Sequence, residues 1–222
     1  MFLGWLGDLL SPPRCASCSA AMAGTPSVFC RPCSASIERC DGAMEPVAFG
    51  QYGGALARTI QRFKYEDHPH LARPLGALLS DACRRSRVEA EVIVPVPLHA
   101  RRLVLRGYNQ SALLARHVAD ELGVPVATDA LARVVDTVPQ VELARDERRA
   151  NVDRAFRVVR AARVEGRVVA LVDDVSTTGS TLRACRNALL RAGVSRVTSV
   201  VVARTAASTL EISSQSDERE PI

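Results

Sequence analysis

Two adjacent carboxylates, Asp173 and Asp174, stand between an unbroken apolar run and a hydroxyl-rich turn. Carboxylates at this place suit the cis-diol of a ribose or a hydrated Mg2+ ion. A helical pattern follows the turn, so the N–H groups of the turn lie at a helix N-terminus, where unpaired donors and the helix dipole favour a bound phosphate. The pattern predicts a phosphate site; capping of the helix by the two aspartates is the simpler alternative. The turn residues that would surround the phosphate are Ser176, Thr177, Thr178, Gly179, Ser180 and Thr181.

Four cysteines near the N-terminus form two C-x-x-C pairs, Cys15 with Cys18 and Cys30 with Cys33. Four thiolates at these spacings predict a closed tetrahedral metal site with no open position for chemistry. A module of about 30 residues has too little core to fold alone, so we expect structural Zn2+ to stabilise it. A redox dithiol or unbound thiols are the alternatives. The other three cysteines are interpreted as one bystander and two small core residues, namely Cys40, Cys83 and Cys185.

Basic side chains follow the apolar run 92–97 and include His99, Arg101 and Arg106. Ligands of open α/β sheets bind outside the carboxyl ends of the strands, so we expect this loop and the phosphate turn to face one cleft. Guanidinium groups pair with phosphate oxygens in bidentate fashion, which favours a pyrophosphate site over a generic basic loop. The only lysine, Lys64, belongs either to a solvated helix face or to the ligand site.

The elements that position these residues follow from hydrophobic periodicity. Apolar runs without polar alternation predict strands buried on both faces at 92–97, 167–174 and 196–203, with shorter pieces at 49–52, 131–135 and 151–159. Helical spacing predicts helices over 56–67, 109–122 and 182–193, and another that begins at Pro69. The repeated β–α–β order indicates right-handed crossovers and a mostly parallel sheet. Residues 136–150 read equally as a mobile lid or as a surface loop with a short helix.

The length of 222 residues suits one medium domain with a small module. We expect an N-terminal helix and zinc-ribbon-like module at 1–45, an α/β domain at 46–205 and a disordered tail at 206–222. Residues 2–10 have the spacing of an amphipathic helix packed on the body, or else of a membrane or partner surface. No P-loop pattern occurs, and no stretch approaches the roughly 20 apolar residues of a membrane span.

The net charge of +5 is concentrated in the middle of the chain, because both ends are net acidic. This distribution fits a polyanionic ligand such as a phosphorylated sugar or a nucleic acid. The apolar N-terminus lacks the basic start and the cleavage site of a secretory signal, and the C-x-x-C pairs suit a reducing compartment. We therefore expect a cytoplasmic protein without membrane insertion.

The stretch V-D-D-V-S-T-T-G-S-T at 172–181 resembles the 5-phosphoribosyl-1-pyrophosphate (PRPP) motif of type I phosphoribosyltransferases. The P-V-P-L-H stretch at 95–99 and R-G-Y-N-Q at 106–110 accompany it, as does an R…Q…R…N region between Arg133 and Asn151. Together with the four-cysteine module, these features are similar to the ComF family and span roughly residues 15–205. The resemblance implies a type I phosphoribosyltransferase fold, with a sheet flanked by helices and a hood over the active cleft.

The same resemblance implies roles for the candidate residues. Asp173 and Asp174 would be the catalytic pair that holds the ribose hydroxyls, the turn 177–181 would hold the 5-phosphate, and the loop with His99, Arg101 and Arg106 would face pyrophosphate and Mg2+. It also implies an association with DNA uptake during natural competence. Two hypotheses follow: an enzyme that moves phosphoribose from PRPP to an unidentified acceptor, or a non-catalytic protein that binds single-stranded DNA or a DNA-uptake partner. The few aromatic residues argue against a base-stacking platform and favour the enzyme.

Overall fold

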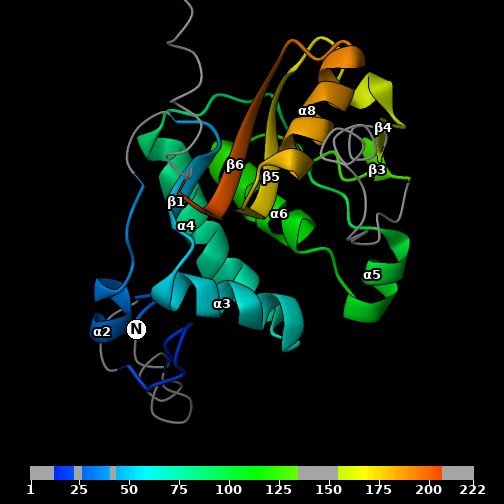
Figure 1. Cartoon of the computed structure of the whole chain (residues 1–222). Coiled ribbons are helices and arrows are strands. Elements are labelled where there is room, and N and C mark those ends of the chain that lie inside the picture. The colour runs from blue at the N-terminus through cyan, green and yellow to red at the C-terminus, as the bar shows by residue number, and fades with distance from the viewer. Residues whose placement is uncertain (1–12, 23–26, 41–43, 135–154, 207–222) are drawn as a thin grey trace, which may run out of the picture.

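A parallel sheet of four strands forms the centre of the computed structural model, which describes residues 13–22, 27–40, 44–134 and 155–206. Every strand pair in this sheet is parallel, and the order of the strands is β1–β6–β5–β2 (Figure 1). The sheet is therefore parallel and flanked by helices, as the sequence predicts. Its strands are β1 (Val47–Gln51), β2 (Val92–Pro95), β5 (Val168–Ser176) and β6 (Arg196–Arg204).

The sheet is buried on both faces because its strands carry apolar side chains at consecutive positions. In β5, Ala170 and Val172 belong to one apolar cluster, whereas Val169 and Leu171 belong to the other. Successive side chains of a strand point to opposite faces, so an uninterrupted apolar run supplies both clusters at once. Two hydrophobic cores therefore enclose the strand that ends in the acidic pair.

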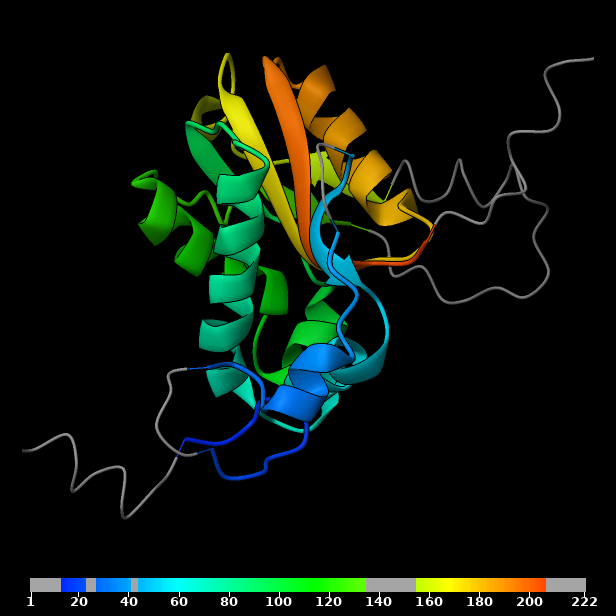
Figure 2. The same ribbon diagram turned by 90° about the vertical axis from the view of Figure 1, so that its left-hand side faces the viewer.

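Helices cover the two faces of the sheet in separate layers. The helices α4 and α6 lie on one face, α8 lies on the other, and Figure 2 shows the sheet between them. The helix α3 lies across the carboxyl ends of the strands, below the sheet in Figure 1. The helices are α2 (Arg31–Ala35), α3 (Gly54–Tyr65), α4 (Ala72–Arg85), α5 (Ala100–Arg106), α6 (Gln110–Leu122) and α8 (Ser180–Arg191), with 3-10 turns at Pro69–Leu71 and Ala161–Arg163.

Two short strands, β3 (Leu131–Arg133) and β4 (Phe156–Val158), form an antiparallel pair apart from the main sheet, next to α8. The sequence predicts strands in both places, and the structure makes them shorter. No helix within the described residues has the length and apolar character of a membrane span.

Three details differ from the sequence-based expectations. The strand expected at 92–97 is shorter, because β2 ends at Pro95, and the short piece expected at 49–52 is β1, which begins at Val47 and pairs with β6. The segment after Pro97, expected as a loop, contains the helix α5, which His99 caps. The helix expected from Pro69 begins with a 3-10 turn, and α4 starts at Ala72. The expectations for residues 2–10, 136–150 and nearly all of the tail lie outside the described residues.

Candidate functional site

The acidic pair lies at the carboxyl end of β5, where the apolar run stops. Asp174 is 5% exposed and Asp173 is half-buried. The Ser111 hydroxyl of α6 donates a hydrogen bond of 2.7 Å to Oδ1 of Asp173, and the backbone N–H of Asp174 donates one of 2.9 Å to the same oxygen. Hydrogen bonds to the carboxylate fix its orientation, so α6 and β5 together hold Asp173 in place.

Lys64 reaches the other member of the acidic pair from the end of α3. Its Nζ lies 2.8 Å from Oδ1 of Asp174, and the side chain of Lys64 is 22% exposed. The interpretation of Lys64 as part of a solvated helix face is therefore wrong. The lysine is one of the groups that surround the acidic pair, and it brings a positive charge to the place where a phosphorylated ligand is expected.

The pKa values in this group reflect burial and mutual charge. Burial, followed by the charge of Asp174, raises the pKa of Asp173 to about 7, although the Ser111 hydrogen bond opposes the rise. Burial favours the neutral amine of Lys64, but the Asp174 carboxylate outweighs it, so the pKa of Lys64 is raised. Near neutral pH the site therefore holds a charged lysine and a carboxyl group, on Asp173, that is about half protonated.

The hydroxyl-rich turn connects β5 with the N-terminus of α8, as the sequence predicts. Gly179 adopts a left-handed conformation with φ of 69° immediately before the helix, a conformation that glycine takes without steric cost. The hydroxyl oxygens of Thr178 and Ser180 lie 3.0 Å apart, and Thr177 and Thr178 are exposed. The turn thus exposes the side chains of Thr177 and Thr178 just before the N-terminus of α8, which suits a phosphate.

A cleft of about 880 Å³ opens beside Lys64, between the end of α3 and the segment 102–108. Arg106 lies over the ring of Tyr65 at 5.1 Å from the ring centroid, and the Tyr108 hydroxyl donates to the carbonyl of Phe63. These contacts connect the end of α5 and the residues after it to the end of α3 that carries Lys64. The residues that line the cleft are Lys64, Tyr65, Asp67, Arg102, Val104, Leu105, Arg106, Gly107 and Tyr108.

The basic residues expected at this cleft are only partly brought together. Arg106 lines the cleft, as expected. Arg102 lines it as well, but the expected Arg101 does not. His99 is the N-cap of α5 and accepts a hydrogen bond of 3.3 Å from the backbone N–H of Arg101. His99, Arg101 and the phosphate turn are not among the lining residues, so their shared role at one cleft stays a prediction.

The four cysteines of the two C-x-x-C pairs come together, and their Sγ atoms all lie within 4.8 Å of one another. The sulfurs of Cys18 and Cys30 are 3.7 Å apart. Tetrahedral zinc with Zn–S bonds of 2.3 Å places its sulfurs about 3.8 Å apart, so the four residues fit such an ion. Cys40 stays outside the cluster, and Cys83 and Cys185 are fully buried, as the sequence predicts.

The thiols of the cluster differ in acidity. Burial alone would raise the pKa of Cys15, but hydrogen bonds from the backbone N–H groups of Cys18, Cys30 and Ser17 lower it to about 6. Burial and hydrogen bonds shared with the neighbouring sulfurs raise the pKa of Cys33 to about 12. A thiolate-bound metal must displace the remaining protons, so binding releases protons and weakens as the pH falls.

Two contributors to the site were not predicted from the sequence. Ser111 binds Asp173, and Tyr65 is 74% exposed under Arg106. The sequence contained one indication of the position of Ser111. Asn109 is the N-cap of α6 and accepts a hydrogen bond from the Ser111 N–H, so Ser111 lies in the first turn of that helix. No local pattern indicates that Tyr65 lies next to Arg106.

The chain matches one domain family, several curated proteins and several solved structures. The model of the phosphoribosyl transferase domain family matches residues 108–219. Competence protein F of Haemophilus influenzae is 34% identical over 196 residues, which cover 86% of this chain and 84% of that protein. DNA utilization protein YhgH of Escherichia coli K12 is 32% identical over 171 residues, covering 75% and 74%. Among solved structures, the APRTase of Giardia lamblia has a TM-score of 0.41 at 18% identity, covering 82% of this chain and 100% of that one.

Proposed function

Because the chain belongs to the family of Competence protein F and DNA utilization protein YhgH and has the type I phosphoribosyltransferase fold, we propose that it binds PRPP, or a closely related phosphorylated ribose, with Mg2+. We further propose that it transfers the phosphoribosyl group to an acceptor. The observation that carries the proposal is the group formed by Lys64, Asp174, Asp173 and Ser111 at the carboxyl end of β5. It lies next to the hydroxyl-rich turn at the N-terminus of α8.

The acidic pair receives the ribose. Carboxylate oxygens accept hydrogen bonds from the 2- and 3-hydroxyls of the sugar, and the Ser111 hydrogen bond keeps Asp173 oriented for this purpose. The 5-phosphate lies in the turn 176–181, where hydroxyls and the first N–H groups of α8 donate to its oxygens. Gly179 contributes its left-handed backbone, which lets the chain turn into the helix at this point.

The pyrophosphate lies on the basic side of the site. Lys64 and Arg106 line the same cleft and provide positive charge for it, and the proposal adds His99 and Arg101 from the start of α5. Asp173 or Asp174 would hold a hydrated Mg2+, because this ion prefers oxygen ligands and keeps several waters, and the ion would supply positive charge against the ligand's phosphates. The two adjacent carboxylates fit a hydrated Mg2+ because they are oxygen donors at the end of one strand and Asp173 is only half-buried.

In the transfer, the bond between C1 of the ribose and the pyrophosphate oxygen breaks, and the electron pair leaves with the pyrophosphate. The acceptor donates an electron pair to C1, forms the new bond and loses a proton to solvent. Positive charge develops on the sugar ring and negative charge on the leaving group. The residues of the site therefore act by positioning the ligand and by stabilising the departing pyrophosphate.

Calorimetric titration of PRPP with Mg2+ into the purified protein tests the proposal. The expected result is saturable binding that the double variant Asp174→Asn, Thr178→Ala loses while it keeps the folded-state circular dichroism of the wild type. Equal affinity in wild type and double variant would mean that the ligand lies elsewhere. Absence of binding to the folded wild type would remove the proposal. Release of pyrophosphate on addition of candidate acceptors then tests the transfer step.

We also propose that the four-cysteine cluster holds one structural Zn2+. Cys15, Cys18, Cys30 and Cys33 supply four sulfur ligands, which leaves no coordination position for substrate. The module is short, so the free energy of metal binding stabilises its fold. Elemental analysis should find about one zinc ion per chain, and four free thiols in a metal-free folded protein would argue against the site.

A second candidate function is the binding of single-stranded DNA or of a DNA-uptake partner without catalysis. The observation in its favour is a second cleft, of about 820 Å³, between the four-cysteine module and the helices α3 and α4. Among the described residues that line it, those with a permanent charge are basic, namely Arg14, Arg62 and Arg73. Such a lining attracts phosphates, and binding that weakens steeply with salt and with Arg14→Gln and Arg73→Gln would support this function.

A further inference from the structure

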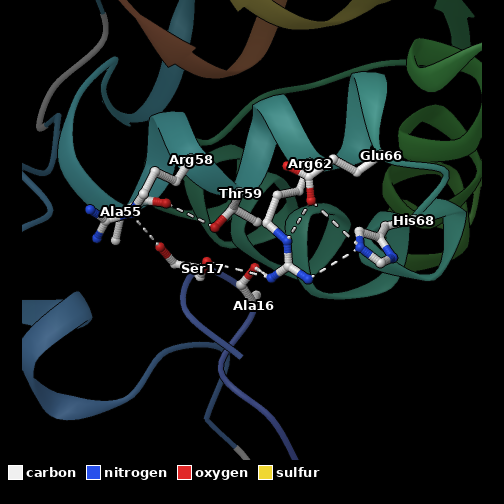
Figure 3. A network of polar contacts seen from close by, with 8 residues as sticks. All are labelled: Ala16, Ser17, Ala55, Arg58, Thr59, Arg62, Glu66 and His68. Atoms are coloured by element: carbon white, nitrogen blue, oxygen red, sulfur yellow. Dashed lines mark hydrogen bonds and ion pairs between the residues drawn. The ribbon is translucent and has the colours of Figure 1, made fainter. Parts of the chain in front are cut away.

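The helix α3 contacts the four-cysteine module on one side and the acidic pair on the other. Lys64 makes its ion pair with Asp174 at the carboxyl end of the helix. Arg62 and Arg58 reach the segment between the first two cysteines, as Figure 3 shows. One short helix therefore connects two sites that lie far apart in the sequence.

Arg62 is the main contact to the module. Its Nη1 donates to the carbonyl oxygens of Ala16 at 2.9 Å and Ser17 at 3.4 Å, which lie between the ligands Cys15 and Cys18. The Nε of the same guanidinium donates to Glu66 at 3.2 Å and Nη2 lies 3.2 Å from Nε2 of His68, and the Arg62 side chain is 18% exposed (Figure 3). Backbone carbonyls accept these bonds, so the position of Arg62 depends on the conformation of the first C-x-x-C pair.

Further contacts fix the start of α3 to the second C-x-x-C pair. Ser36 accepts a hydrogen bond of 3.1 Å from the N–H of Ala55 and donates one of 2.8 Å to the carbonyl of Cys33. A Cβ atom added to Gly54 would lie 2.6 Å from the carbonyl oxygen of Ser36, so the helix begins in close contact with the module. Arg58 lies near the Cys33 sulfur, with 4.0 Å between Nη2 and Sγ.

The two sides of α3 are separated by helix geometry. Arg62 and Lys64 are two residues apart, which is about 200° around an α-helix, so their side chains leave in nearly opposite directions. A movement or rotation of the helix that releases Arg62 therefore also displaces Lys64. Phe63, between them, is fully buried, and its carbonyl accepts a hydrogen bond from Tyr108, so the end of α3 is packed against the segment that lines the cleft.

We propose that α3 couples the metal state of the four-cysteine cluster to the acidic pair, with Arg62 as a positioning residue that acts through Lys64. When the cluster holds its metal, the carbonyls of Ala16 and Ser17 are fixed, Arg62 is held, and Lys64 stays on Asp174. Loss of the metal releases α3 and separates the ion pair. The consequence for ligand binding rests on the proposed function, whereas the coupling itself does not.

Coupling between two sites is reciprocal. If the metal holds Lys64 in place and so favours ligand binding, the bound ligand must strengthen metal binding by the same factor. Typical coupling free energies correspond to about 5- to 150-fold changes in affinity. This reciprocity supplies a test that needs no knowledge of the acceptor and no catalytic turnover.

The primary experiment uses Lys64 as its own reporter, because it is the only lysine in the chain. The zinc-loaded protein is treated with a limiting amine acylating reagent, and the modified fraction of the peptide that carries Lys64 is followed by mass spectrometry against an added lysine-containing reference peptide. Asp174→Asn gives the rate for Lys64 without its partner. Removal of zinc by a chelator should increase the wild-type rate about fivefold or more, toward the Asp174→Asn rate.

Arg62→Gln separates coupling from unfolding, because this variant retains all four cysteines and is used only with its zinc content verified. Acylation of Lys64 should be faster in Arg62→Gln than in wild type even with zinc bound. The lost positive charge cannot explain that result, since it would raise the pKa of the lysine and slow acylation. Arg73→Gln is the matched control, because Arg73 is exposed and lines the same cleft beside the four-cysteine module as Arg62. Lys64 in this variant should be acylated at the wild-type rate.

An unchanged acylation rate of Lys64 in both the zinc-free protein and zinc-loaded Arg62→Gln overturns the coupling, whether or not PRPP binds.

The second measurement is the rate of zinc loss to a zinc-selective chelator with and without PRPP and Mg2+. Slower zinc loss with ligand in wild type, but not in Arg62→Gln, is expected. If PRPP binds but the rate of zinc loss does not change, the coupling is contradicted and the proposed function is not. If PRPP does not bind, the proposed function is contradicted, and the acylation result decides the coupling.

Discussion

The Nζ atom of Lys64 lies 2.8 Å from Oδ1 of Asp174, although the two residues are more than a hundred positions apart in the sequence. This ion pair joins the end of α3 to the end of β5. It puts the only lysine of the chain beside the two aspartates that are expected to hold the ribose. Substitution of Lys64 can therefore test the proposed ligand site, as substitution of the aspartates does.

Replacement of Lys64 should weaken both stability and ligand binding. Lys64→Met leaves the buried Asp174 without its charged partner, which should cost about 2 kcal/mol of unfolding free energy. It should also weaken PRPP binding by about tenfold or more, since one charged contact to phosphate is lost. Lys64→Arg keeps the charge and should recover part of the stability. Denaturant unfolding and calorimetric titration measure the two effects, and wild-type affinity in Lys64→Met would remove the lysine from the ligand site.

Asp173 should make stability and binding depend on pH. Its pKa is about 7 in the folded protein against an ordinary value of 3.8, so the folded state binds more protons between these values. The free energy of unfolding should therefore fall as the pH rises from about 4 to 7, and the contribution of this group should be constant above that. In Asp173→Asn this slope should disappear, as unfolding at several pH values would show.

Binding of PRPP with Mg2+ should strengthen as the pH rises from 6 to 8, because the ligand and the cation favour ionised Asp173. The phosphate groups of the ligand titrate in the same range, so the comparison is between the wild type and Asp173→Asn at each pH. The ratio of their affinities should increase with pH. A ratio that stays constant would show that Asp173 does not titrate against the ligand.

Gly179→Ala should impair the phosphate turn by its backbone alone. The added Cβ would be 3.8 Å from the Ser176 hydroxyl, an ordinary contact, but alanine at φ of 69° is strained by roughly 1–2 kcal/mol. Gly123→Ala is the matched control, with φ of 67°, open space around it and no place in the site. Both variants should lose similar stability, and only Gly179→Ala should lose ligand affinity. Equal affinities would contradict the assignment of the turn to phosphate.

Metal content should depend on which cysteine is replaced. Cys33→Ser removes one of four clustered sulfurs and should abolish stable zinc binding, with a lower melting temperature. Cys40→Ser replaces a buried cysteine outside the cluster and should retain about one zinc ion per chain. Elemental analysis with thiol titration measures both, and loss of zinc in Cys40→Ser would mean that the ligand set is different.

The sequence predicted those features that depend on interactions between residues close together in the chain. The two C-x-x-C pairs indicated a four-sulfur cluster, because each pair brings two thiols to one ion by its own turn. The apolar run before Asp173 predicted a strand buried on both faces, and Gly123 predicted the end of α6, where it is left-handed. Hydrophobic periodicity, caps and turns depend on neighbouring residues, so a single sequence carries them.

Only the tertiary structure decided which of these segments meet. The pairing of β1 with β6, the Ser111 bond to Asp173 and the Lys64 bond to Asp174 all join segments far apart in the chain. Such contacts depend on sheet order and on the packing of α3 between the module and the strand ends, which no local pattern encodes. The sequence by itself determined the chemical groups of the two sites, and the position of one helix decided that the sites are connected.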